Sequence, residues 1–438
     1  MPSADNFVLS SPHDFAIYLP ATNPQYANVT KLDVKNGRPL PLGFDLEDLA
    51  FWTGNSKLWN HKFLLHSIGA YSVGTDTKGP LFRKKKGDFT FVGDSGGFQI
   101  GKGSWGGLTN LSAGMTGDAA YAGWNDNYDA KLWIIDWLEQ HSDYAMTLDM
   151  PLWTMFESNA KSPFHLCSEE QLLAMTLDNL KLIDAQKRGR TTWLNVIQGT
   201  TPTNTMTWWN AVKKYRFGGW ALAGSAGWRG GLYNMLSTVL AMNDEDAFDE
   251  GTKWVHLLGL SQAKWDVFLT AIQMQLRKKN KTIQVSCDSA TPFSSAGVRD
   301  QYAIPPALGK RVDDWGLKFK TLSAVRSHAD PSNARPSRLA SPLGQQLQMH
   351  HLVVDGSDYA GRRVDELTNL LVANHNTWVI LDAGRRANQL AFGGGRNELP
   401  DDFSRVLDAI EQAFSVRNWR DVLTENKSVF DRVAPDKY

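Results

Sequence analysis

Short apolar segments that end in a polar residue or a glycine recur along the chain. Six of these segments are rich in β-branched and aromatic residues, which indicates β-strands. They read FTFVGD, YAMTLD, WLNVIQG, GWALAGS, WVHLLGL and TIQVSCD, with polar or glycine positions near their ends at Asp94, Asp149, Gln198, Gly224, Gly259 and Asp288. Successive ends are spaced as a strand plus a crossover helix requires, which takes about 30 residues with room for insertions.

Helical patterns lie between these strands. The segment AKLWIIDWLEQH places its apolar residues at helical spacing. A second helix is expected from Ser168, which forms a capping box with Gln171, to Gly189, and a third from Ser261 onwards. Strands and helices that alternate in this way predict a parallel sheet with helices outside it.

A closed barrel needs two further strands. HDFAIYLP and HKFLLHSIGA, which begin at His13 and His61, can supply both, and TWVILDAG near Val379 is an alternative. Polar residues end many strands at once, which favours a (β/α)8 TIM barrel, because the sites of such barrels lie at the carboxyl ends of the strands. An open doubly wound sheet would gather these residues at one switch point.

The chain is expected to divide near residue 300. We predict a TIM-barrel domain over residues 1–300 and a loop-rich, mostly helical C-terminal portion over residues 301–438 that packs on the barrel. The segment Arg326–Gln346 is basic and rich in proline and serine, which predicts an exposed loop. Helical spacing returns later, in DDFSRVLDAIEQAFSVRNW.

Composition places limits on this picture. Of the 438 residues, 42% are apolar and 21% are charged, as in soluble globular proteins. No run of about 18 apolar residues occurs and the first residues lack the pattern of a secretory signal, so we expect a cytoplasmic protein without a membrane partner. Cys167 and Cys287 are the two cysteines, which excludes a disulfide scaffold and a zinc knuckle of two cysteine pairs. The net charge is zero, so a nucleic acid would need a local basic patch.

Three aspartates, Asp94, Asp149 and Asp288, each end an apolar strand. Two carboxylates in one dry cavity suffice to break a glycosidic bond, because one attacks the anomeric carbon while the other transfers protons. The alternative is that each aspartate caps the following helix, where this residue type is common. Three aspartates at the same edge of one barrel favour a shared site.

The segment DSGGFQ ends the first of these strands. Ser95, Gly96 and Gly97 allow a tight turn that brings the backbone close to a ligand, and Phe98 then offers a flat face on which a base can stack. Burial of Phe98 in the core is the alternative. The glycine-rich segments GGFQIGKG and AFGGGRN do not fit a dinucleotide loop, since the former lacks the GxGxxG spacing and the latter follows no strand.

Taken in order, DSGGFQ, TLDMP, VIQG, GGWALAGSAG, HLLGL and SCDSATP resemble the queuine and archaeosine tRNA-ribosyltransferase superfamily, the guanine transglycosylases. The resemblance covers about Gly93 to Asp288. It implies a (β/α)8 barrel that removes guanine from a polynucleotide and installs a 7-deazaguanine base without ATP.

The resemblance also implies roles for the three aspartates. Asp94 is the expected general acid and base, and Asp288 is the expected nucleophile, whose attack on C1′ would form a covalent glycosyl-enzyme. Two displacements would then retain the stereochemistry. Asp149 is expected to read the guanine edge, a role that suits a carboxylate because it accepts two adjacent N–H groups in a fork.

Further residues are expected around the base. Gln198 and Gly224 would hold its carbonyl side, while Phe98 and Leu258 would stack on its ring. The predicted substrate-binding residues are Ser95, Phe98, Asp149, Gln198, Gly199, Gly224, Leu258 and Gly259.

The chain departs from the tRNA-acting members, which generally carry a CxCxxC-plus-histidine zinc site after the barrel. No cysteine follows Cys287, and His328, His350 and His351 do not define a ligand set, so we expect no zinc and no other cofactor. The residues after Arg299 show no sign of an appended RNA-binding domain. These features, with the wording of SCDSATP, favour the branch that modifies DNA, the DpdA-like enzymes of bacteria and their phages.

The expected reaction is therefore exchange of guanine in DNA for a 7-deazaguanine such as preQ0, in the cytoplasm of a bacterium or a phage-infected host. The same exchange on tRNA is the first alternative, and a catalytically silent nucleic-acid-binding partner subunit is the second. A duplex substrate would require the target base to flip out, at a cost of about a few kcal/mol.

Basic residues are the candidates for contact with phosphates, although charged segments are more often solvated surface. The predicted contact residues are Arg83, Lys84, Lys85, Lys86, Arg277, Lys278, Lys279, Arg299, Arg326, Arg335 and Arg338. The sequence leaves the oligomeric state open.

Overall fold

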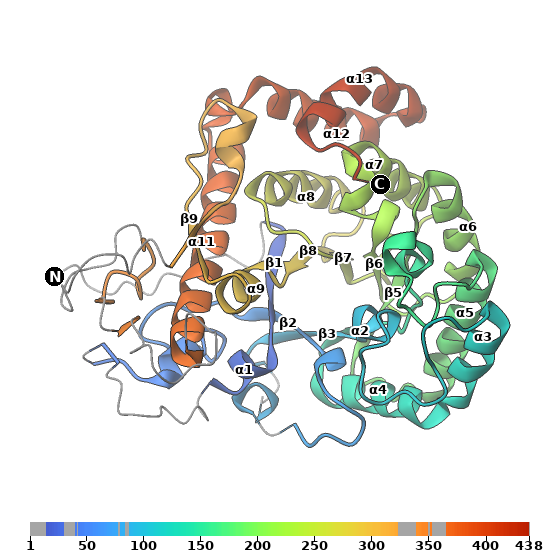
Figure 1. Ribbon diagram of the computed structural model, residues 1–438. Helices are drawn as coiled ribbons and strands as arrows, with labels where there is room; N and C mark the ends of the chain where they lie inside the picture. The colour runs from blue at the N-terminus through green and yellow to red at the C-terminus, as the bar shows by residue number, and fades with distance from the viewer. Residues whose placement is uncertain are drawn as a thin grey trace.

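Eight parallel strands close into a barrel, in the order in which they follow one another along the chain (Figure 1). The structure is a computed structural model that describes residues 15–29, 40–41, 43–77, 79–83, 87–322, 339–348, 351–352 and 365–437. The strands are β1 Ile17–Thr22, β2 Phe63–Ser67, β3 Thr90–Asp94, β4 Tyr144–Met146, β5 Thr192–Ile197, β6 Gly219–Leu222, β7 Trp254–Leu257 and β8 Gln284–Ser289. The TIM barrel predicted from the sequence is confirmed.

The barrel closes where β1 pairs with β8, in a register that sets Leu19 opposite Asp288. The two predicted front segments supply β1 and β2, as the spacing required. The competing segment near Val379 is not a strand but part of helix α11 (Glu366–Phe392). Alternate strand residues fill the barrel interior: Ile17, Leu19, Leu65, Val92, Met146, Leu194, Val196, Ala221 and Trp254.

Helices lie outside the barrel strands (Figure 1). They are α1 Pro24–Ala27, α2 Gly97–Gly101, α3 Gly117–Asp126, α4 Tyr128–His141, α5 Glu169–Gln186, α6 Pro202–Val212, α7 Gly231–Asp244, α8 Ala263–Leu276 and α9 Thr291–Gly297. The predicted capping box at the start of α5 is present, since Ser168 Oγ accepts from the Gln171 backbone N–H and Gln171 Oε1 accepts from that of Ser168. Among the described residues, no helix is long and apolar enough to span a membrane.

Single turns of 3-10 helix connect these elements. They are η3 Leu46–Leu49, η4 Ile68–Ala70, η5 Pro80–Arg83, η6 Leu152–Met155, η7 Glu157–Asn159, η8 Gly224–Ala226, η9 Trp228–Gly230, η10 Val312–Trp315 and η12 Arg396–Glu398.

The C-terminal portion is mostly helical, as predicted. It begins with an antiparallel pair that the sequence did not reveal, β9 Gln301–Ile304 and β10 Lys318–Thr321. Helix α11 then runs along one side of the barrel against α8 and α9, and α12 (Asp401–Ser415) and α13 (Trp419–Val433) lie over α8 and α7 (Figure 1). The predicted exposed loop Arg326–Gln346 lies outside the described residues up to Arg338. In its described part Leu339, Ser341 and Leu343 are buried, so the prediction of exposure is wrong there.

Buried amides of α11 tie this portion to the barrel. Asn374 accepts a hydrogen bond from Trp59 Nε1 (3.0 Å) and donates one to Tyr26 Oη (2.8 Å). Asn376 donates to the Pro292 carbonyl of α9 (3.1 Å). Because α9 directly follows β8, helix α11 helps to hold the segment that carries Asp288.

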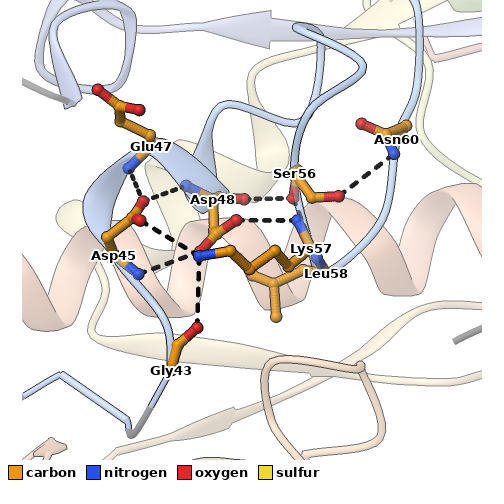
Figure 2. A network of polar contacts seen from close by, with 8 residues as sticks. All are labelled: Gly43, Asp45, Glu47, Asp48, Ser56, Lys57, Leu58 and Asn60. Atoms are coloured by element: carbon orange, nitrogen blue, oxygen red, sulfur yellow. Dashed lines mark hydrogen bonds and ion pairs between the residues drawn. The ribbon is translucent and has the colours of Figure 1, made fainter.

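The connection from β1 to β2 is held by a network of charged side chains (Figure 2). Asp45 caps η3, and Lys57 Nζ lies 3.3 Å from both Asp45 Oδ2 and Asp48 Oδ2. Asp48 Oδ1 accepts from the Lys57 backbone N–H (2.8 Å), and Ser56 donates to the Asp48 carbonyl. The network shapes the connection just before Trp59, which bonds to α11.

Candidate active site

The three strand-end aspartates come together at the carboxyl edge of the barrel. Asp94 is the last residue of β3, Asp149 follows β4, and Asp288 lies near the end of β8. Burial raises the pKa of the Asp94 carboxyl, a hydrogen bond from Ser67 opposes the shift, and the negative charge of Asp288 raises the pKa further. The charge of Asp94 in turn raises the pKa of Asp149. The three carboxyls therefore lie near enough for the charge of one to shift the pKa of another.

Asp149 and Gln198 form a buried pair. Gln198 Nε2 donates to Asp149 Oδ2 (2.5 Å), and each residue is less than a tenth exposed. Burial raises the pKa of Asp149 to about 7, with the Gln198 hydrogen bond opposing and the Asp94 charge adding to the shift. A Cβ atom at Gly97 would lie 3.6 Å from Asp149 Oδ1, so the glycine turn lies against this carboxyl.

The turn after Asp94 requires glycine. Gly96 has a φ of 80°, and a Cβ atom there would lie 2.8 Å from the Cα of Gly69. Ser95 is buried and donates its hydroxyl hydrogen to the Thr147 carbonyl (3.1 Å). Ser95, which was predicted to bind substrate, thus fastens β3 to the segment after β4 in this structure.

Phe98 projects from the start of α2 and is 53% exposed, so it is not a core residue. Its ring centroid lies 5.5 Å from that of Trp153, and Lys102 Nζ lies 4.4 Å from the Phe98 centroid. Leu258 is partly buried and packs against the barrel interior. Trp153 and Lys102 were missed from the sequence. Lys102 lies four residues after Phe98, the spacing of neighbours on a helix, whereas nothing in the sequence linked Trp153 to Phe98.

Asp288 is held by two groups from the neighbouring strand β7 and the residues after it. Its Oδ1 accepts a hydrogen bond from the Gly259 backbone N–H (2.9 Å) and lies 3.2 Å from His256 Nε2. Gly259 has a φ of 86°, which glycine adopts readily. His256 was not among the predicted site residues, although strict alternation in WVHLLGL places it on the same face as the interior Trp254.

The remaining predicted glycines shape the loops after β5 and β6. The Gly199 carbonyl accepts from the Ser225 backbone N–H (2.6 Å), and a Cβ atom at Gly199 would collide with Thr205 Oγ1. Gly224 has a φ of 60°. The hydrogen bond between Gly199 and Ser225 thus ties the loops after the adjacent strands β5 and β6 together.

The predicted phosphate contacts are not all brought to this edge. Arg277 donates to the Ile283 carbonyl (2.9 Å) and to Gln284 Oε1 (3.0 Å) at the start of β8. Arg277, Lys278 and Lys279 therefore lie at the amino edge, opposite Asp288, because they end the helix that leads into that strand. Their contact with phosphates stays a prediction, and any such contact would lie away from the edge that carries Asp288.

Other basic candidates remain predictions. Arg83 ends η5 and is exposed, and Arg299 is exposed just after α9. The rest of the predicted contacts lie outside the described residues: Lys84, Lys85, Lys86, Arg326, Arg335 and Arg338.

Within the described ranges, no group of three or more His, Cys, Asp or Glu side chains is placed to hold a metal ion. His351 is buried, with its Nδ1 accepting from the Gln348 backbone N–H (2.9 Å). His328 and His350 lie outside the described ranges, so the absence of zinc stays a prediction.

A scan against protein-family models finds no match for this chain, and no curated protein matches its sequence.

Proposed function

We propose that the protein is a guanine transglycosylase that exchanges guanine in DNA for a 7-deazaguanine base such as preQ0. The observation that carries the proposal is the placement of Asp94, Asp149 and Asp288 at the carboxyl ends of β3, β4 and β8 of one closed barrel, where the charge of Asp288 raises the pKa of Asp94 and that of Asp94 raises the pKa of Asp149. A pair of carboxylates that share one sugar is what cleavage of a glycosidic bond requires. The order of the segments from DSGGFQ to SCDSATP supports the choice of guanine as the base.

The pair Asp149 and Gln198 suits recognition of guanine. Ionised Asp149 can accept the N1–H and N2–H groups of the base in a fork. The amide nitrogen of Gln198 carries two hydrogens, so it can keep its bond to Asp149 and donate the second hydrogen to O6 of guanine. Phe98 and Leu258 would stack on the two faces of the ring.

The exchange proceeds in two displacements. A carboxylate oxygen of Asp288 attacks C1′, the C1′–N9 bond breaks, and the protonated carboxyl of Asp94 gives its proton to the departing guanine. Asp94 then takes a proton from the incoming 7-deazaguanine, whose N9 attacks C1′ and breaks the bond to Asp288. Burial and the neighbouring charge, which raise the pKa of Asp94, suit a group that must hold and release this proton.

DNA is the proposed polynucleotide because residues 288–438 contain no cysteine for a zinc site of the tRNA-acting type, and because of the wording of SCDSATP. The target guanine would flip into the barrel. Arg83 and Arg299 are exposed and could contact phosphates. Exchange on tRNA and a silent nucleic-acid-binding subunit are the competing functions, and the cytoplasm of a bacterium or an infected host is the proposed compartment.

Trapping of the covalent intermediate tests the proposal. The wild-type protein is incubated separately with duplex DNA and with tRNA, and each reaction is quenched in detergent. The reaction with DNA should give a protein–DNA adduct that migrates slowly in a denaturing gel. Asp288→Asn should give none, while the exposed control Asp126→Asn should match the wild type. An adduct with tRNA alone would replace DNA by tRNA as substrate, and no adduct or guanine release with either would favour the silent subunit.

A further inference from the structure

A chain of three polar side chains links β7 and β8 inside the barrel and ends at Asp288. Trp254 Nε1 donates to Ser286 Oγ (2.6 Å), and Ser286 Oγ lies 2.8 Å from His256 Nδ1. His256 Nε2 lies 3.2 Å from Asp288 Oδ1. His256 and Ser286 are fully buried, where a polar group costs free energy unless it is hydrogen-bonded, and the chain satisfies each of them.

The chain fixes the position of the ring proton of His256. The ionised carboxylate of Asp288 can only accept, so the nitrogen that faces it, Nε2, must be the donor. Ser286 Oγ accepts from the indole N–H of Trp254 and has its own hydrogen left to donate to His256 Nδ1. Nε2 then carries the proton that faces the carboxylate of Asp288. The opposite tautomer would set a lone pair of Nε2 against Asp288 Oδ1, which is repulsive.

Both donors to Asp288 meet the same oxygen. His256 Nε2 and the Gly259 backbone N–H each point to Oδ1, at 3.2 Å and 2.9 Å. Oδ2 makes no hydrogen bond to any residue of the described ranges. Two donors fix the rotation of the carboxylate and leave Oδ2 as the oxygen with a lone pair available for attack.

We infer that His256 is a positioning residue, which Trp254 and Ser286 hold as the Nε2–H tautomer and which anchors Oδ1 of Asp288 so that Oδ2 attacks C1′. The inference rests on the proposed function. It adds a residue that acts on the nucleophile through a hydrogen bond and does not itself touch the base. Orientation of a nucleophile is effective because a small misplacement of the attacking atom is enough to slow a displacement.

A purely structural role makes a different prediction. If His256 only fills the barrel interior, its replacement would lower stability but leave the rate of each folded molecule unchanged. The groups that would read the base edge, Asp149 and Gln198, follow other strands, β4 and β5, and replacement of His256 leaves the stacking residue Leu258 in place, so affinity for the free base should change little in either case. The rate of adduct formation therefore separates the two roles.

Two variants of similar size test the inference. His256→Gln keeps an N–H donor near the position of Nε2, whereas His256→Asn is too short to reach Asp288. In single-turnover trapping with DNA, His256→Asn should form the adduct about 100-fold more slowly than the wild type and His256→Gln within about tenfold of it, the size expected for one preorganised donor. The dissociation constant for free preQ0, measured by calorimetry, should stay within about threefold in both, and near-wild-type circular dichroism shows that each is folded.

A second measurement is read on the wild-type protein, and a variant serves only to assign the signal. Nitrogen-15 spectra of histidine-labelled wild-type protein, with the His256 signal assigned by its loss in His256→Gln, should show the proton on Nε2. A proton on Nδ1, or an adduct rate in His256→Asn equal to that of the wild type, would overturn the inference alone. Failure of the wild type to form any adduct would overturn the proposed function and the inference together.

Discussion

Asp149 is placed where its charge depends on pH in the neutral range. Burial raises its pKa to about 7, and only the ionised carboxylate accepts both N–H groups of a guanine edge. The fraction that is ready to bind therefore falls as the pH is lowered through 7. Under the proposed function, recognition of the base should therefore depend on pH through Asp149.

We expect the dissociation constant for free preQ0 to rise by up to about tenfold for each pH unit below 7 and to level off above 8, because binding must remove a proton from Asp149. Calorimetry between pH 5.5 and about 8.5 measures this dependence. Asp149→Asn should bind weakly, with an affinity that does not change over the same range. Affinity that increases toward low pH in the wild type would contradict the role given to Asp149.

Asp266 is a second buried carboxyl, but it lies on α8 behind the barrel wall. Burial raises its pKa to about 7, and a hydrogen bond from Cys287 Sγ opposes the shift. In the unfolded chain the carboxyl ionises near its ordinary value of about 4. Its contribution to stability is therefore fully present below pH 4 and is lost as the pH rises from about 4 to about 7.

Asp266→Asn keeps the shape of the side chain and removes its ionisation. The difference in free energy of unfolding between Asp266→Asn and the wild type should favour the variant by about 2–4 kcal/mol more at pH 8 than at pH 4.5. At pH 8 the wild type must bury a charged carboxylate, and the variant does not. Urea unfolding at both pH values measures the difference. The same substitution at exposed Asp126 is the control, and an equal effect of Asp266→Asn at the two pH values would rule out this account.

Individual site residues were predictable to different degrees. Asp94, Asp149 and Asp288 followed from strand ends alone, because the carboxyl ends of parallel strands meet at one edge. His256 was missed because one histidine in an apolar strand is usually a core residue, and its partner Ser286 carries no signal of its own. The charge of the basic residues from Arg277 did not tell which edge of the barrel they occupy, although their position just before a strand indicates the amino edge.

Helix α11 contains the segment that the sequence left open as an alternative strand. The apolar run around Val379 has the length of a strand, and periodicity cannot tell a buried strand from a helix buried on most sides. The structure buries even the polar residues Asn374, His375 and Asn376 of this helix. Its identity follows from the full length of 27 residues and not from the apolar run.

The close packing of α11 on α8 gives a test at this scale. A Cβ atom at Gly384 would lie 2.5 Å from Asp266 Oδ2, in a buried contact with little room to relax. Gly384→Ala should therefore lower the free energy of unfolding by about 1–3 kcal/mol, as for other overpacked sites. Gly297→Ala in α9, where nothing lies within 4 Å of the added atom, is the matched control and should be neutral. Urea unfolding measures the stability of both variants. Equal stability would contradict this account, because it would show that α11 can move away from α8 at little cost in free energy.

The whole molecule is a barrel whose C-terminal helices share its core. The alternation of strands and helices predicted the barrel, since each unit of a strand and its crossover helix has a recognisable length. The sequence did not predict how far the residues after 300 join the core. This depends on contacts between residues that are far apart along the chain, such as Trp59 and Asn374. The backbone N–H of Leu232 in α7 likewise donates to the Ala434 carbonyl near the chain end (2.9 Å).

Exchange of a base within DNA is the activity that this arrangement is proposed to perform, and one measurement tests it most directly. Duplex DNA is incubated with the protein and preQ0, digested to nucleosides and analysed by mass spectrometry, with the released guanine quantified in parallel. We predict a preQ0 nucleoside in the DNA and one guanine released for each base inserted, both absent with Asp288→Asn. Unchanged DNA with the wild type, or full exchange by Asp288→Asn, would contradict the account.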